Sequence, residues 1–167
     1  MKFRLLLLSG LMLFFTVFFK NGYAMKLSSA AFSNNGFMPV KYSCKGEDIS
    51  PPLQWEDFPS ETQSFALIMS DPDAPMGTWD HWIVVNIPST QTSLSEDTKS
   101  LQMLPNSWGR KDYGGPCPPS GTHHYIFDLY ALDTKLDLPA NTDKKLLLSK
   151  IKPHIIDSAK LTGLFQK

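Results

Sequence analysis

The chain has 167 residues, and its 16 Lys and Arg balance its 16 Asp and Glu, which is typical of one globular domain. Charged residues make up 19% of the chain and form no long block of one sign, so a nucleic-acid partner is not expected. Aromatic residues, at 12%, exclude a disordered chain.

The first 24 residues are predicted to be a secretory signal peptide. Two basic residues precede an apolar run from Leu5 to Phe19, and small residues stand at the cleavage-type positions before Met25. The alternative is a membrane anchor, but the run is shorter than the ~20 apolar residues of a spanning helix. We therefore expect residues 25–167 to form one domain that is periplasmic or secreted and not transmembrane. If Met25 is the true start, the protein is instead cytoplasmic.

Two cysteines, Cys44 and Cys117, lie in the expected mature domain. An even number of cysteines in an exported protein indicates one disulfide. Closing a loop of this length would stabilise the fold by roughly 4 kcal/mol in the chain-entropy model. The alternative is two independent buried thiols, which is the favoured interpretation if the chain starts at Met25.

Short apolar runs alternate with turn residues between Met25 and Asp133, which predicts a mostly β domain. Residues 91–115 lack an apolar period, and we expect them to form a long irregular connection that shapes a site. In chain order, the expected strands are a weak one over 37–42 and strong ones over 64–70, 82–87 and 125–132.

The C-terminal segment has helical spacing. Asn141 or Thr142 can cap a helix, and apolar residues then recur at helix-like intervals. Pro153 interrupts this pattern, because its ring clashes with the preceding turn. We therefore expect two short helices, of which the second ends at Gly163.

Polar residues that could carry chemistry stand at the ends of the predicted strands. Asp71 follows one strand, His81 opens the next and His123 opens a third. Because successive residues of a strand face opposite sides, His123 and Tyr125 share one face and His124 lies on the other. We therefore expect only His123 of the histidine pair to enter a pocket with Asp71 and His81.

A metal centre and a nucleophilic hydrolase are weaker hypotheses for these residues. Asp71, His81 and His123 could ligate a metal, but the usual metal-site spacings are missing, so no metal and no cofactor are expected. The nucleophile-elbow, phosphate-loop and dinucleotide motifs do not occur in the sequence. The groups that these segments do offer are imidazole, phenol and backbone N–H donors. Such donors suit a small anion, for example a phosphate ester. Asp71 would orient a histidine, or act only as a turn residue.

Two longer segments carry a family resemblance: DPDAPMGTWDHWIVVNIP at 71–88 and GGPCPPSGTHHYIFDLYALD at 114–133, supported by GEDISPPLQW at 46–55. They resemble the phosphatidylethanolamine-binding protein family, in its bacterial Raf kinase inhibitor-like branch. The resemblance implies a mostly β fold, a Greek-key β-sandwich with short C-terminal helices, and a shallow anion pocket. It also implies which residues bind the ligand: Asp71, Pro75, Trp79, His81, Gly115, Pro119, His123 and Tyr125.

The chain departs from the family pattern at two positions. Asp80 precedes His81 where mammalian relatives have a second histidine, and His124 stands where the family often has arginine. The first change alters the local charge, and the second removes a cation from the face opposite the pocket. Asp73 also belongs to the motif, and we expect it to brace the loop.

The leading functional hypothesis is an exported, non-catalytic binding protein whose pocket holds a phosphorylated small molecule or a phospholipid headgroup. The alternative is a protein-interaction module that inhibits or modulates a partner enzyme through the same pocket. A weak hydrolase that uses His81 or His123 as a base is a third possibility.

Overall fold

The computed structural model describes residues 24–139 and 142–167. The expected signal peptide therefore lies outside the described residues, apart from Ala24. No helix in the two described ranges is long and apolar enough to cross a membrane. The elements are β1 (Lys26–Ser28), β2 (Gly36–Phe37), the 3-10 helix η1 (Val40–Tyr42), β3 (Leu53–Glu56), β4 (Ser64–Asp71), β5 (Trp79–Pro88), β6 (Ser93–Leu94), β7 (Gln102–Met103), β8 (Thr122–Leu132), α1 (Lys144–Ile151), the 3-10 helix η2 (Lys152–His154) and β9 (Ile155–Gln166).

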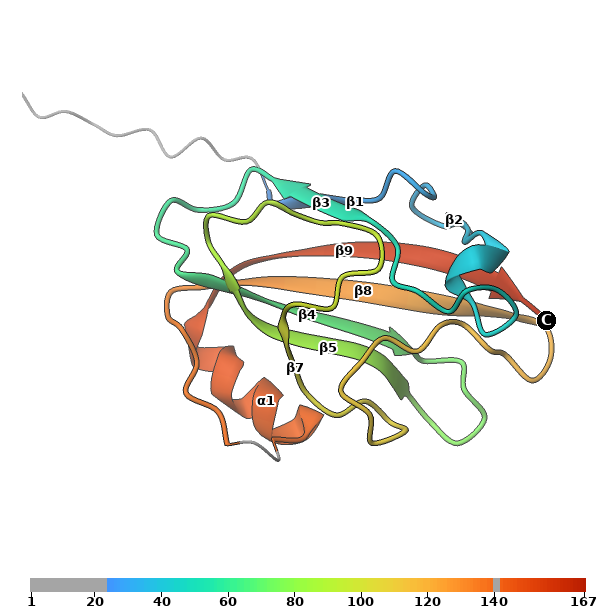
Figure 1. Ribbon diagram of the computed structural model, residues 1–167. Coiled ribbons are helices and arrows are strands. Elements are labelled where there is room, and N and C mark those ends of the chain that lie inside the picture. The colour runs from blue at the N-terminus through green and yellow to red at the C-terminus, as the bar shows by residue number, and fades with distance from the viewer. Residues whose placement is uncertain (1–23, 140–141) are drawn as a thin grey trace, which may run out of the picture.

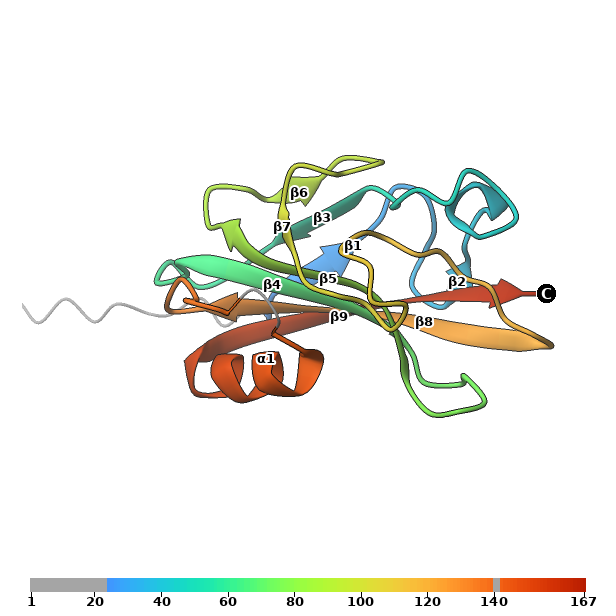
Figure 2. The ribbon, with the colours of Figure 1, turned by 60° about the horizontal axis from the view of Figure 1, so that its bottom comes forward.

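The strands form two sheets, a three-stranded sheet in the order β1-β3-β6 and a six-stranded sheet in the order β2-β9-β8-β4-β5-β7. Figure 1 shows β8 and β9 running side by side as the longest strands. In Figure 2 the small sheet lies over one face of the large sheet, and α1 lies against the opposite face. The predicted mostly β sandwich is confirmed.

Both faces of the large sheet are covered. On β4, Phe65 and Leu67 pack with Trp55 of the small sheet in the main core. Ile68 faces the other way and packs with Leu147 of α1 in a second cluster. Every residue of β4 is buried for this reason, which explains why the segment reads as a continuous apolar run instead of an alternating one.

The three strong strand predictions are confirmed, since β4, β5 and β8 contain residues 64–70, 82–87 and 125–132. The weak strand over 37–42 is largely wrong, because only its first residue is in a strand and Val40–Tyr42 form η1. The segment 91–115 is irregular apart from the two-residue strands β6 and β7.

The first C-terminal helix is confirmed as α1, although the cap lies one residue later than expected, at Asp143, whose side chain accepts the Leu146 N–H. The second helix is wrong, because β9 occupies residues 155–166 and pairs antiparallel with the full length of β8. Pro153 ends the helix, and the buried residues that follow, Leu161, Gly163 and Phe165, recur with a period of two. That period is typical of a strand.

Candidate functional site

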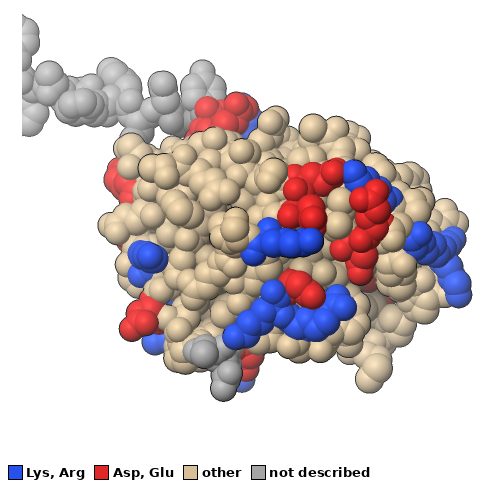
Figure 3. Space-filling model, viewed as in Figure 1, with Lys and Arg blue, Asp and Glu red and all other residues tan. Residues whose placement is uncertain are grey.

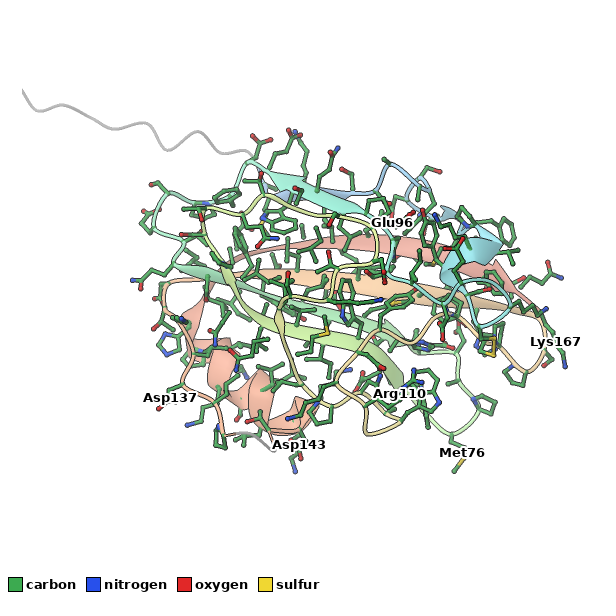
Figure 4. All side chains as sticks on the ribbon, in the orientation of Figure 1. Met76, Glu96, Arg110, Asp137, Asp143 and Lys167 are labelled. Carbon is green, nitrogen blue, oxygen red and sulfur yellow. A yellow bond between two sulfur atoms is a disulfide. The ribbon has the colours of Figure 1, made fainter. Side chains whose placement is uncertain are left out.

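A pocket of about 300 Å³ lies where β4 ends and β5 and β8 begin. β4 runs antiparallel to both of its neighbours, so the end of this central strand meets the starts of the flanking strands. Met76, in the loop between β4 and β5, points outward at the rim (Figure 4). The lining residues are Asp71, Ala74, Pro75, Met76, Trp79, His81, Trp108, Cys117, Pro119, His123 and Tyr125.

Asp71 and His123 form a buried pair on one wall of the pocket. Nδ1 of His123 lies 2.7 Å from Oδ2 of Asp71. The other carboxylate oxygen, Oδ1, accepts the backbone N–H of Asp73 at 2.8 Å. Each carboxylate oxygen of Asp71 therefore has a partner within the protein, and the contact with Nδ1 leaves Nε2 of His123 as the nitrogen available to a ligand.

His81 is held differently, because its Nδ1 lies 2.7 Å from the backbone carbonyl oxygen of Gly114. The ring makes edge contacts with Tyr125 and Trp108, at centroid distances of 5.2 and 5.0 Å. Burial lowers the pKa of His81, and the opposing effects of the Gly114 carbonyl and nearby Asp71 are weaker. This histidine is therefore neutral near pH 7.

Two buried donors of the pocket lack a hydrogen-bond partner among the described residues, the Tyr125 hydroxyl and Nε1 of Trp79. Burial, reinforced by the charge of Asp71, raises the pKa of Tyr125 far above its ordinary value. The phenol therefore keeps its proton at every physiological pH. A buried donor without a partner costs about 1–3 kcal/mol, so these two groups are unsatisfied polar atoms among the residues that line the pocket.

His124 lies outside the pocket lining, on the exposed face of β8. Its Nδ1 and its backbone N–H both lie within 2.8 Å of Oδ2 of Asp73, and these hydrogen bonds lower the pKa of Asp73. Asp73 therefore braces the loop against β8, as expected. Asp80 forms an ion pair with Lys144 of α1 and does not line the pocket.

All the predicted ligand-binding residues line the pocket except Gly115. The backbone N–H of Gly115 donates to Oδ1 of Asp48 at 2.6 Å, and a Cβ at this position would lie 2.3 Å from the Tyr42 carbonyl oxygen. Gly115 is therefore a close-packing position behind the pocket. The predicted disulfide is present between Cys44 and Cys117, and it ties the pocket-lining residue Cys117 to the chain near Tyr42.

The lining residues that the sequence analysis did not assign are Ala74, Met76, Trp108 and Cys117. Ala74 and Met76 lie inside the 71–88 motif, and Cys117 was assigned only to the disulfide. Trp108 comes from the irregular segment 91–115 and packs edge-on against Trp79 at 5.4 Å. An aromatic residue within a polar loop was the one signal in the sequence that could have indicated its role.

Charge does not concentrate at this pocket, since the part of the chain that the structure describes places no Lys or Arg in its lining. Figure 3 shows acidic and basic side chains interspersed on the face viewed there. A larger cavity of about 410 Å³ is lined by charged residues of both signs, among them the ion-paired Asp97 and Lys99. The smaller pocket is the better candidate, because several buried polar side chains line it and two of them lack a hydrogen-bond partner.

Comparisons with known proteins agree with this geometry. The family model of the phosphatidylethanolamine-binding protein matches residues 28–166. A UPF0098 protein from Methanothermobacter thermautotrophicus is 45% identical over 150 residues, covering 86% of this chain and 99% of the relative. A UPF0098 protein from Aquifex aeolicus is 40% identical over 170 residues, covering 96% and 99%.

Two solved structures have the same fold. The crystal structure of a phosphatidylethanolamine-binding protein homologue from Chlamydia trachomatis superposes with a TM-score of 0.82 at 42% identity, covering 86% of this chain and 98% of that one. Escherichia coli YbcL, described as a member of the mammalian family, has a TM-score of 0.80 at 31% identity, covering 87% and 99%. The chain therefore belongs to the phosphatidylethanolamine-binding protein family.

Proposed function

We propose that this chain is a non-catalytic binding protein whose pocket holds a phosphate-bearing ligand. The proposal depends on one observation: two unpartnered buried donors, on Tyr125 and Trp79, share a pocket with the His123 ring that Asp71 orients. Anionic oxygens would satisfy both donors. His123, when protonated, would add a charge-assisted hydrogen bond.

The expected affinity is modest. A shallow site of this kind supplies a few charge-assisted hydrogen bonds of roughly 1.5–3 kcal/mol each. Subtracting the entropic cost of association leaves dissociation constants in the micromolar to millimolar range. Such weak binding suits a sensor or a modulator.

Export is part of this proposal. The first 24 residues have the pattern of a cleaved signal peptide, and the Cys44–Cys117 disulfide is of a kind that persists in oxidising compartments. Sequencing the N-terminus of the protein purified from its native host tests this. A mature chain that begins at Met25 and is recovered from the periplasm supports export, and recovery of reduced protein from the cytoplasm overturns it.

The binding proposal is tested by following the histidine ring signals in proton NMR. The purified domain is titrated with phosphate, phosphoethanolamine and acetate. We expect the His81 and His123 signals to shift saturably with the two phosphate compounds and not with acetate. If neither signal shifts with any phosphate compound, the pocket does not bind phosphate.

Neighbouring histidines provide a matched control. His123→Ala should weaken phosphate binding about tenfold to a hundredfold, as expected for the loss of one charge-assisted bond. His124→Ala removes the adjacent ring, which is exposed and points away from the pocket, and should have little effect. Equal losses would contradict the assignment of the site to the His123 face of β8.

A protein-interaction module is the second candidate, and the pocket rim favours it. Met76 is 94% exposed and Trp108 is 44% exposed, and both border the pocket. Exposed apolar residues at the rim of a pocket are common at docking sites. A phosphoserine peptide with apolar flanking residues should then bind about tenfold more tightly than free phosphoserine, and Met76→Ser should remove that gain. Equal affinities would argue for a small-molecule ligand.

A further inference from the structure

The two pocket histidines differ in what holds their Nδ1 atoms. Nδ1 of His123 faces a carboxylate, Oδ2 of Asp71, whereas Nδ1 of His81 faces a carbonyl oxygen, that of Gly114. A carbonyl oxygen only accepts hydrogen bonds, so Nδ1 of His81 must carry the proton. In a neutral ring the other nitrogen, Nε2, is then an acceptor.

The surroundings of His81 keep its ring neutral. The residue is 3% exposed and lies between the rings of Trp108 and Tyr125. Desolvation lowers its pKa below the ordinary value, which is ~6.5 for histidine. The Nε2 lone pair is therefore present at neutral pH.

The charged groups around His81 are already engaged with other partners. Asp71 on β4 accepts from His123 and from a backbone N–H. Asp80, the neighbour of His81 on β5, pairs with Lys144 of α1. Tyr125 on β8 stays a neutral phenol because burial raises its pKa. The Tyr125 hydroxyl makes no hydrogen bond among the described residues and the two carboxylates are engaged elsewhere, so none of the three donates to Nε2 of His81.

The pocket thus combines unpaired donors with an acceptor. Tyr125 and Trp79 offer an O–H and an N–H, and His81 offers the lone pair of Nε2. An anion whose oxygens all lack protons can satisfy the donors, but it would place a negative oxygen against that lone pair. A ligand that is complementary to the whole pocket needs both a P–O⁻ and a P–O–H group.

We propose that the pocket selects phosphate monoesters in their singly protonated form, with the P–O–H group donating to Nε2 of His81, and discriminates against phosphodiesters and sulfate. This inference rests on the proposed function and decides between the two sources of phosphate that fit it. A phospholipid headgroup is a diester without a P–O–H group, so the ligand is a free or protein-borne monoester.

Calorimetric titration of the wild-type protein with methyl phosphate, dimethyl phosphate and sulfate tests the inference. These probes are small oxyanions that differ in whether an oxygen carries a proton. At pH 6.5 methyl phosphate should bind roughly tenfold more tightly than the other two, because it alone can donate to Nε2 of His81. Its affinity should fall towards pH 7.5, as the second phosphate proton, with a pKa near 6, is lost.

The outcomes separate this inference from the proposed function. Equal binding of all three anions, or preferred binding of the diester or sulfate, overturns the selectivity and leaves the phosphate pocket standing. Binding of none of the three overturns both proposals.

A variant isolates the role of His81. His81→Gln places an amide that can turn its N–H₂ towards the ligand, so the preference for methyl phosphate over dimethyl phosphate should shrink to within about threefold. His123→Gln should weaken all three anions alike and leave their order unchanged. Retention of the full preference in folded His81→Gln would overturn the assigned role of Nε2.

Discussion

Asp73 and His124 form an exposed pair, with 2.7 Å between Oδ2 and Nδ1, beside the buried pair of Asp71 and His123, where the same two atom types are also 2.7 Å apart. The inner pair joins the end of β4 to β8, and the outer pair joins the loop that follows β4 to the opposite face of β8. The inner pair orients a pocket histidine, and the outer pair braces the loop. They should therefore respond differently to substitution.

Asp71→Asn should weaken methyl phosphate binding about tenfold to a hundredfold, because it removes the carboxylate that holds the His123 ring in place. Calorimetry at pH 5.5 measures the change. Asp73→Asn is the matched control, because it neutralises an acid two residues away that does not line the pocket. A similar loss in both variants would indicate that loop position, and not the charge of Asp71, governs affinity.

Asp73→Asn should lower the free energy of unfolding at pH 7 by about 0.5–1 kcal/mol, a value limited by the solvent exposure of the pair. The folded-state pKa of Asp73 is lowered by His124, so its stabilising contribution is present above the unfolded pKa of 3.8 and is lost as pH falls through the folded value. Urea unfolding from pH 7 to pH 2.5 measures this. A difference between wild type and variant that persists at pH 2.5 would contradict the linkage.

Replacing both Cys44 and Cys117 with Ser should destabilise the fold by roughly 4 kcal/mol, since their disulfide closes a loop over a sequence separation of 73 residues. Chemical denaturation of wild type and variant gives the difference. The ligand affinity of the folded variant should also fall, because Cys117 lines the pocket. Wild-type protein treated with reductant serves as an independent comparison, and unchanged stability in both cases would exclude a structural role for the bond.

Gly115→Ala should destabilise the fold by about 1–3 kcal/mol, the usual cost of overpacking. The added Cβ would lie 2.3 Å from the Tyr42 carbonyl oxygen, and backbone cannot move aside as a flexible side chain can. Thermal unfolding measures the loss of stability. Gly121→Ala is the comparison variant, which separates the effect of packing from that of backbone strain. A Cβ at Gly121 meets open space, although its φ of 68° makes that substitution unfavourable for a different reason.

Most of the fold was predictable from local patterns. The segments 64–70, 82–87 and 125–132 are so rich in apolar and β-branched residues that they predict buried strands without any tertiary information. The opposite facing of His123 and His124 also followed from strand alternation alone. Of the residues that the family motifs predict for the pocket, all but Gly115 line it, whereas Ala74, Met76, Trp108 and Cys117 also line it without having been predicted to bind the ligand.

The C-terminal strand could not be predicted in this way. Ile151, Ile155 and Ile156 recur at intervals that also suit a helix, and a short window does not separate the two periods. β9 pairs with β8 along the full length of β8, and this partner lies outside any local window of the sequence. Long-range pairing of this kind overrides local propensity.

The sequence by itself determined which residue types could bind an anion, the strand faces on which the histidines lie, and the two cysteines available for a disulfide. Only the tertiary structure decided the hydrogen-bond partner of each histidine. His81 lies against the carbonyl of Gly114 and His123 lies against the carboxylate of Asp71, and each contact joins segments far apart in the chain. An imidazole is a donor or an acceptor according to its partner, so the chemistry of the pocket is fixed by folding.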